Sequence, residues 1–280
     1  MLSFPKSTKQ QNQGRRTGKK FEIRISKLET NNKCSKYKNS NSLEFRKLLF
    51  LICFGFRVSN FEFMNKGKLI VIEGSDGSGK TTQAKLLLDY LQSKKIASAY
   101  ISFPRYEASV WGKMIRRFLN GEFGQLDPYF ASMLYAGDRL TAAPKIRKWL
   151  DEGKVVVCNR YVASNAGHMA AKFKSQSEKS KYIAWLEQLE YEENGIPKED
   201  AVVLLEVDAA TSRVLMKNRK LDIHEKDLKY QEEVHKVYDV LAKKKGNWIK
   251  VDCTKNGGIL PPLEIHNKVA EMLKIKGYVG

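Results

Sequence analysis

A glycine-rich segment that ends in a lysine and two threonines carries the clearest chemical signal in this sequence. Residues 74–81 read GSDGSGKT and match the pattern G-x-x-x-x-G-K-[ST] at every fixed position. The glycines let backbone N–H groups turn toward a β-phosphate, and a helix beginning near Lys80 points its positive end at the same place. The segment therefore predicts a phosphate-binding loop (P-loop) for ATP. Its expected ATP contacts are Gly74, Ser75, Asp76, Gly77, Ser78, Gly79, Lys80, Thr81 and Thr82.

Two side chains of this loop have chemistry suited to phosphoryl transfer. Lys80 reaches the β- and γ-phosphates, and the Thr81 hydroxyl can bind Mg²⁺. Asp76 is the acidic residue of the loop and a second candidate for contact with the metal ion. A plain glycine turn is the alternative, but a predicted strand precedes the segment and a predicted helix follows it, which is the context that a P-loop requires.

Strand and helix patterns alternate from residue 68 onward and would position the loop. Segments of five to seven mainly apolar residues predict strands at 69–73, 99–103, 154–158, 201–207 and 248–252. Helical spacing of apolar residues predicts helices after the loop (Ala84, Leu87, Leu88 and Leu91 on one face) and at 110–119, 127–150, 180–193, 228–244 and 262–275. Near-continuous apolar strands that alternate with helices predict an α/β fold, a doubly wound parallel five-stranded sheet flanked by helices.

Two arginines directly follow predicted strands, at the edge where doubly wound folds bind ligands. Arg105 comes after Phe103-Pro104, and Arg160 comes after the third strand. A guanidinium can hold a phosphate through two parallel hydrogen bonds, so both residues are candidates for binding an acceptor phosphate. The alternative is that each is an ordinary surface arginine with no role in binding.

Three further side chains are suited to binding a nucleobase. Tyr135 lies one helical turn before Arg139, so the pair can present a flat ring to a base and a donor to its carbonyl edge. Asn165 carries both a donor and an acceptor, which match the N3/O4 edge of a pyrimidine. The alternatives are a core tyrosine, a solvated arginine and a loop-capping asparagine.

Other classes of P-loop protein fit the sequence less well. A GTPase should show a DxxG switch and an NKxD base-reading motif, and neither occurs at a suitable position; residues 65–68 (NKGK) precede the loop and lack the Asp. An ATPase motor is normally larger. Residues 64–280, with one P-loop, suit a small-molecule kinase.

From residue 68 to the C-terminus the sequence resembles the thymidylate kinase family. The motifs that carry the resemblance are EGSDGSGKTT at 73–82, FPR at 103–105, YAGDR at 135–139, NRYVASN at 159–165 and RKLDIHE at 219–225. The resemblance implies Mg²⁺-dependent transfer of the γ-phosphoryl group of ATP to dTMP for dTTP synthesis, in a cytoplasmic homodimer. It implies that Asp76 orients the sugar 3′-hydroxyl of the acceptor. It implies substrate binding by Phe103, Arg105, Tyr135, Arg139, Arg160 and Asn165.

The sequence departs from the family pattern in two places. The family's Asp before Arg-Tyr is Asn159, which brings no negative charge to a metal ion. The P-loop has no cation besides Lys80, so the cation that stabilises the transition state must come from elsewhere, and a mobile lid rich in Lys and Arg is the expected source; Arg105 or Arg160 would bridge donor and acceptor otherwise. Arg219 is the predicted catalytic residue there, and its neighbours Lys217 and Lys220 are the alternatives. Asp222 and Glu225 either hold the lid, contact a metal ion or form a solvated face.

The first 63 residues differ in composition from the rest of the chain. The 280 residues carry a net charge of +19, and residues 1–63 hold 14 Lys and Arg against 4 Asp and Glu. Residues 1–42 are rich in Lys, Asn, Ser and Gln and are predicted to be disordered. The apolar run 48–56 is too short to span a bilayer, which takes roughly 20 residues. The extension is a targeting segment, a tail for nucleic acid or a membrane surface, or a segment without function before Met64; we favour the last.

Two other functions stay open beside dTMP phosphorylation. One is another P-loop deoxynucleoside or nucleotide kinase, although two phosphate-binding arginines favour a monophosphate acceptor. The other is a nucleic-acid-binding protein that uses the basic extension, which deletion of residues 1–63 would abolish. Four distant cysteines without a CxxC pair, and four histidines without metal spacing, support neither a zinc site nor a disulfide scaffold.

Overall fold

The structure, a computed structural model, describes most of the chain after the basic extension. The described residues are 66–207, 211–212, 227–255 and 258–279. The chain divides into two units, Met1–Phe61 and Glu62–Gly280, and the description that follows concerns the second. The predicted disorder of residues 1–63 and the predicted lid around 213–226 lie outside the described residues.

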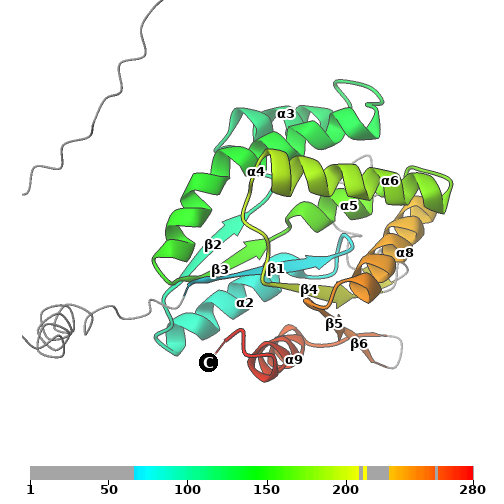
Figure 1. The fold of residues 1–280 in the computed structure, drawn as a ribbon. Helices are drawn as coiled ribbons and strands as arrows, with labels where there is room; N and C mark the ends of the chain where they lie inside the picture. Colours follow the sequence, from blue (N-terminus) through cyan, green and yellow to red (C-terminus); the bar gives the residue numbers. More distant parts are fainter. Residues whose placement is uncertain (1–65, 208–210, 213–226, 256–257, 280) are drawn as a thin grey trace, which may run out of the picture. The chain divides into compact units, whose positions relative to one another are not determined.

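Five parallel strands form the central sheet in the order β2-β3-β1-β4-β5 (Figure 1). They are β1 (Lys68–Gly74), β2 (Ser98–Ser102), β3 (Val155–Asn159), β4 (Ala201–Glu206) and β5 (Trp248–Asp252). Each lies within one residue of its predicted bounds, so the prediction of a doubly wound five-stranded parallel sheet is confirmed. Because β1 pairs with β3 on one side and β4 on the other, the P-loop leaves the sheet where the strand order reverses.

Helices connect the strands, and three of them have the predicted bounds. The helical elements are α2 (Lys80–Ser93), α3 (Val110–Leu119), α4 (Pro128–Asp151), α5 (Val162–Ala170), α6 (Gln176–Glu187), the π-helical turn η1 (Gln188–Glu193), α8 (Leu228–Lys244) and α9 (Pro262–Ile275). A short antiparallel pair, β6 (Thr254–Lys255) and β7 (Gly258–Ile259), precedes α9. None of the helices in the described segments has the length and apolar character needed to cross a membrane.

The prediction of one helix over 180–193 is wrong at both ends. The helix begins at Gln176, because Ser175 and Glu178 form a capping box in which each side chain bonds the other residue's backbone N–H. It ends at Glu187, where the π-helical turn η1 continues the chain. Helix α5 was not predicted at all.

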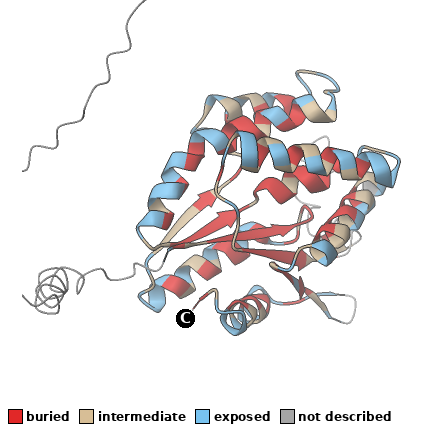
Figure 2. Cartoon of the chain, in the orientation of Figure 1, coloured by how far each residue is buried: buried red, intermediate tan, exposed pale blue. Residues whose placement is uncertain are grey.

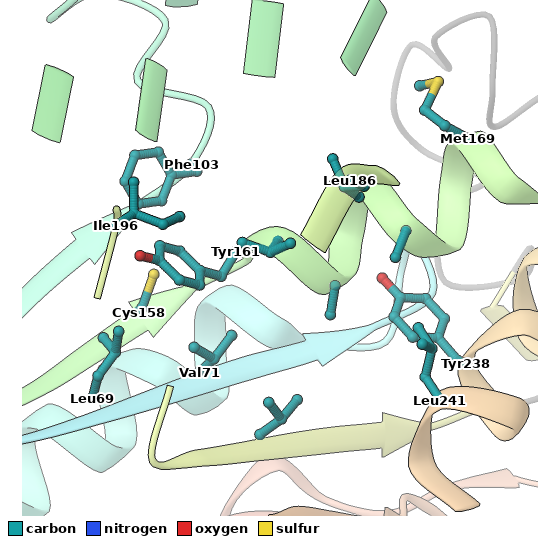
Figure 3. Close-up of a cluster of buried hydrophobic side chains, with 14 of the residues drawn as sticks. Leu69, Val71, Phe103, Cys158, Tyr161, Met169, Leu186, Ile196, Tyr238 and Leu241 are labelled. Atoms are coloured by element: carbon teal, nitrogen blue, oxygen red, sulfur yellow. The ribbon is translucent and has the colours of Figure 1, made fainter. Parts of the chain in front are cut away.

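The sheet separates two apolar cores, because successive side chains of a strand point to opposite faces. On β1, Leu69 and Val71 face one core, to which helices α3, α4, α5, α6 and α8 contribute. Ile70 and Ile72 face the other, which is closed by α2 and α9. Figure 2 shows the burial concentrated along the strands, and Figure 3 shows part of the first core. The strands between these two cores end at the carboxyl edge of the sheet, and the polar residues of the site lie along that edge.

Candidate active site

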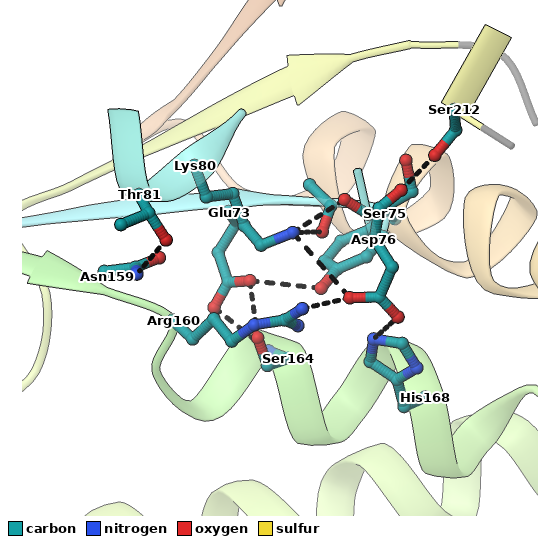
Figure 4. Close-up of polar contacts among 12 residues, drawn as sticks. Glu73, Ser75, Asp76, Lys80, Thr81, Asn159, Arg160, Ser164, His168 and Ser212 are labelled. Carbon is teal, nitrogen blue, oxygen red and sulfur yellow. Dashed lines mark hydrogen bonds and ion pairs between the residues drawn. The ribbon is translucent and has the colours of Figure 1, made fainter. Parts of the chain in front are cut away.

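The P-loop joins β1 to α2 and keeps its lysine folded against the backbone. Gly77 and Gly79 have φ angles of 80° and 83°, in the left-handed region that favours glycine. Gly79 is the N-cap of α2, and no side chain of the described segments caps that helix end. The Lys80 ammonium donates to the carbonyl oxygens of Gly74 at 3.0 Å and Ser75 at 2.6 Å (Figure 4). The loop therefore has the shape of an anion-binding site, and the Lys80 ammonium lies against its first residues.

Asp76 is a buried carboxylate surrounded by basic groups (Figure 4). The Arg160 guanidinium donates to its Oδ1, Lys80 Nζ lies 4.0 Å from the same oxygen, and His168 Nε2 lies 3.9 Å from Oδ2. Burial acts to raise the pKa of Asp76, but Arg160, His168 and Lys80 together outweigh it and hold the pKa well below its usual range. Asp76 therefore stays ionised, and its charge is balanced.

Glu73, a residue that the sequence-based site omitted, ties the P-loop strand to the loop that carries Arg160. Its Oε1 accepts from the backbone N–H groups of Tyr161 at 2.8 Å and Ser164 at 3.1 Å. Its Oε2 accepts from the hydroxyls of Ser164 at 2.7 Å and Tyr238 at 3.1 Å. Arg160 itself has a φ angle of 64°, which costs a non-glycine residue energy unless its surroundings enforce it. The hydrogen bond from the N–H of the next residue, Tyr161, to Glu73 helps to hold Arg160 in this conformation.

One cavity of about 720 Å³ opens at this edge, within the size range of small-ligand sites. Its lining includes six of the predicted ATP contacts, namely Asp76, Gly77, Gly79, Lys80, Thr81 and Thr82. It also includes five of the predicted substrate contacts, namely Phe103, Tyr135, Arg139, Arg160 and Asn165. The donor-side and acceptor-side residues, predicted from separate motifs, thus meet in a single cavity. His168, Tyr106 and Arg116 also line it and were not predicted.

Arg105, the sixth predicted substrate contact, is not among the lining residues and is held by α4. Its backbone N–H donates to Asp138 Oδ2 at 2.7 Å, and its Nε donates to Asp138 Oδ1 at 3.0 Å. Its Nη2 donates to the Asp138 carbonyl at 2.7 Å and to Thr141 Oγ1 at 2.5 Å. The phosphate-binding role of Arg105 stays a prediction, and Asp138 is the residue that orients it.

Arg139 and Asn165 reach the cavity from α4 and α5. Arg139 is buried and its Nε donates to Oε1 of Glu190, in η1, at 2.9 Å. Burial acts to lower the pKa of Arg139, but the Glu190 carboxylate outweighs it and raises the pKa above its usual value. Asn165 Nδ2 donates to the Ser132 carbonyl at 3.3 Å. No motif in the sequence pointed to Glu190.

The residues around Thr81 fit a magnesium ion held mainly by nucleotide phosphates. Asn159 Nδ2 donates to Thr81 Oγ1 at 3.1 Å and to Ser102 Oγ at 3.2 Å, while Asn159 Oδ1 is buried with no hydrogen-bond partner among the described residues. No cluster of three or more metal-binding side chains occurs in that part of the chain. Mg²⁺ in nucleotide sites takes few protein ligands beside phosphates and water, so one hydroxyl and one unpartnered amide oxygen suffice.

The predicted lid cation cannot be placed in this site. Arg219, its neighbours Lys217 and Lys220, and the acidic residues Asp222 and Glu225 all lie outside the described residues. Their roles stay predictions.

A P-loop at the centre of a five-stranded parallel sheet, opening into a cavity lined by Tyr135, Arg139, Arg160 and Asn165, is the arrangement of a P-loop nucleotide kinase. The sequence profile of thymidylate kinase matches residues 72–260. The chain belongs to the thymidylate kinase family and is an enzyme that phosphorylates dTMP.

Individual relatives agree with this assignment. The chain is 34% identical over 203 residues to the thymidylate kinase of Mycobacterium tuberculosis, in strain CDC 1551 and in strain H37Rv, an alignment that covers 69% of this chain and 94% of the relative. Its structure is similar to that of thymidylate kinase from Candida albicans, with a TM-score of 0.62, 25% sequence identity, and coverage of 76% of this chain and 93% of the other.

Proposed function

We propose that the enzyme carries out a Mg²⁺-dependent, direct transfer of the γ-phosphoryl group of ATP to dTMP, giving ADP and dTDP for dTTP synthesis. The observation that carries this proposal is the single cavity, whose lining includes Lys80 and Thr81 of the P-loop together with Arg139 and Asn165. Two nucleotides bound in one cavity can react without an enzyme-bound intermediate, so catalysis is positioning and charge stabilisation.

In this reaction a 5′-phosphate oxygen of dTMP attacks the γ-phosphorus, and the bond between that phosphorus and the oxygen bridging it to the β-phosphate breaks. Lys80 stabilises the charge that develops on the phosphate oxygens, while Arg160 and Arg105 hold the acceptor phosphate. Asp76, kept ionised by its neighbours, accepts a hydrogen bond from the sugar 3′-hydroxyl. Tyr135 and Phe103 contact the base, and Arg139 and Asn165 bind its polar edge.

Mg²⁺ bound by the Thr81 hydroxyl would neutralise charge on the β- and γ-phosphates. Asn159, whose Nδ2 bonds the Thr81 hydroxyl, has an Oδ1 that is unpartnered among the described residues and would accept from a water of that ion. Asp76 is less suited to the metal, because Arg160 already occupies its Oδ1.

Arg219 is proposed to supply the transition-state cation. Lys80 is the single cation in the P-loop sequence, and Arg160 and Arg105 are assigned to the acceptor phosphate, so a further cation for the γ-phosphoryl group has to come from another segment. A lid that closes over the phosphates would bring a further guanidinium and exclude water.

The acceptor is tested by measuring ADP release with dTMP, dUMP, CMP, AMP and GMP, with Mg²⁺ and with a chelator. We expect kcat/KM to be highest for dTMP and activity to vanish without divalent metal. A higher kcat/KM for another acceptor would assign a different nucleotide kinase, and full activity in the chelator would remove the metal from the proposal.

A homodimer is proposed from an apolar surface on α3 and α4. Val110, Phe130, Met133 and Leu140 are 73%, 54%, 49% and 42% exposed, and the last three follow a helical repeat along α4. A Met133→Glu variant should run as a monomer in sedimentation experiments if this surface pairs two subunits. A wild-type monomer would contradict it.

Residues 64–280 are proposed to be the whole kinase domain, working in the cytoplasm, with residues 1–63 dispensable. The truncated chain should keep the kcat and both KM values of the full chain. Binding of RNA by the full chain, with loss of activity on truncation, would support the nucleic-acid function instead.

A further inference from the structure

The ion pair between Arg139 and Glu190 holds the arginine at the cavity by only part of its guanidinium. Both side chains are buried, at 2% and 0% exposure. Arg139 Nε and Nη2 donate to Glu190 Oε1, and Nη1 donates to the Tyr161 carbonyl at 3.2 Å. A guanidinium has five N–H donors, so one hydrogen on Nη1 and one on Nη2 have no acceptor in the described structure. Because Arg139 lines the cavity, an acceptor placed there would satisfy them.

Glu190 reaches Arg139 through an unusual piece of backbone. It lies in η1, the π-helical turn that continues the chain directly after α6 ends at Glu187. Single π-helical turns are rare in proteins, and many of those that occur lie at functional sites. The turn directs Glu190 inward, whereas its neighbour Glu192 stays exposed and pairs with Lys198. The wider turn thus places one carboxylate of an acidic segment inside the protein.

The free energy of the Arg139–Glu190 ion pair suits a role in positioning Arg139 more than a role in stabilising the fold. A buried charge pair gains little net stability over apolar residues, but removal of one partner leaves an uncompensated charge. Glu190 Oε2 is buried and has no hydrogen-bond partner in the described segments, so this carboxylate is not optimised for stability. The pair is specific in another respect, because the two bonds that Arg139 Nε and Nη2 donate to Glu190 Oε1 set the plane of the guanidinium.

We propose that Glu190 is a positioning residue for the acceptor: it turns the open edge of Arg139 toward the base of dTMP and thereby sets the affinity for dTMP. This inference rests on the proposed role of Arg139 in base binding. Glu190 itself touches neither nucleotide. Its substitution should therefore act on dTMP and leave ATP unaffected.

The test compares Glu190→Gln, which removes the charge, with Glu190→Asp, which keeps the charge but withdraws the carboxylate by one methylene group. In Glu190→Gln a neutral acceptor bonds the guanidinium about half as strongly as a carboxylate, and in Glu190→Asp the shorter side chain draws the carboxylate away from Nε and Nη2. We therefore expect the KM for dTMP to rise about tenfold or more in both variants. The KM for ATP should stay within twofold and kcat within about threefold. Glu192→Gln, the same substitution on the exposed side of the same turn, is the matched control and should match wild type.

A double variant separates positioning from a general loss of structure. Arg139→Met should raise the KM for dTMP at least as much as Glu190→Gln, and the combination Arg139→Met/Glu190→Gln should be no worse than Arg139→Met alone, because Glu190 acts only through Arg139. Additive effects, or a rise in both KM values, would overturn the proposal. Glu190→Asp keeps the buried charge balanced, so it tests the proposal even if Glu190→Gln does not fold.

The outcome also distinguishes this inference from the proposed function. If Arg139→Met raises the KM for dTMP and neither Glu190 variant does, Arg139 binds the base without help from Glu190, and only this inference fails. If Arg139→Met leaves that KM unchanged, the base-binding role of Arg139 fails and the inference falls with it.

Discussion

Replacement of Glu73 should destabilise the whole domain, because this one carboxylate of β1 accepts hydrogen bonds from the N-terminal end of α5 and from Tyr238 in α8. Glu73→Ala would leave the buried N–H of Tyr161 and the half-buried N–H of Ser164 without an acceptor, while the hydroxyls of Ser164 and Tyr238 can turn to other partners. A buried unsatisfied donor costs about 1–3 kcal/mol, so the Tyr161 amide costs about that much and the Ser164 amide at most the same again, for a total of up to about 6 kcal/mol. That is a large part of a typical stability of about 5–15 kcal/mol.

The assay is denaturant unfolding followed by tryptophan fluorescence and circular dichroism, with the melting temperature beside it. For a domain of this size we expect Tm to fall by about 5–20 °C in Glu73→Ala. Glu73→Gln keeps an oxygen for both amides and should lose about half as much free energy of unfolding. Glu192→Ala, which removes an exposed ion pair, should change it by at most about 0.5 kcal/mol. A loss below about 1 kcal/mol in Glu73→Ala would refute the assigned hydrogen bonding.

Three predictions concern catalysis. Lys80→Ala should lower kcat by about a thousandfold or more without changing the circular dichroism spectrum, since Lys80 acts on charge that develops during transfer; near-normal turnover would contradict its role. Arg105→Ala should raise the KM for dTMP and lower kcat with little change in the KM for ATP, and the reverse pattern would move Arg105 away from the acceptor. Arg219→Ala should lower kcat and kcat/KM together by about 100-fold with both KM values nearly unchanged, and Arg219→Lys should recover part of the loss. If Arg219, Lys217 and Lys220 can each be replaced by alanine without effect, no lid cation is catalytic.

The sequence predicted the sheet and the P-loop well because both depend on local patterns. The central strands β1, β3 and β4 are buried almost throughout, so their apolar runs stand out from the neighbouring sequence. The P-loop needs particular residue types at fixed spacing. Helix α5 was missed because it is only nine residues long, almost wholly buried and without a side-chain cap, so it has neither an amphipathic period nor a start signal.

The site residues that the sequence missed are those defined by contacts between distant segments. Glu73 meets Ser164 and Tyr238, which follow it by 91 and 165 positions. Glu190 meets Arg139 across 51 positions, from a π-helical turn that no sequence period indicates. Only the folded chain shows that Asp138, next to Arg139 in one motif, serves Arg105 instead.

The stereochemical course of the reaction tests most directly the claim that ATP and dTMP react with each other in one cavity. The experiment uses ATP made chiral at the γ-phosphorus with oxygen isotopes and sulfur, and determines the configuration of the thiophosphoryl group in the dTDP analogue formed. A single in-line transfer between the two bound nucleotides predicts inversion at phosphorus. Retention of configuration would show two successive displacements through a phosphorylated enzyme, and would contradict the account.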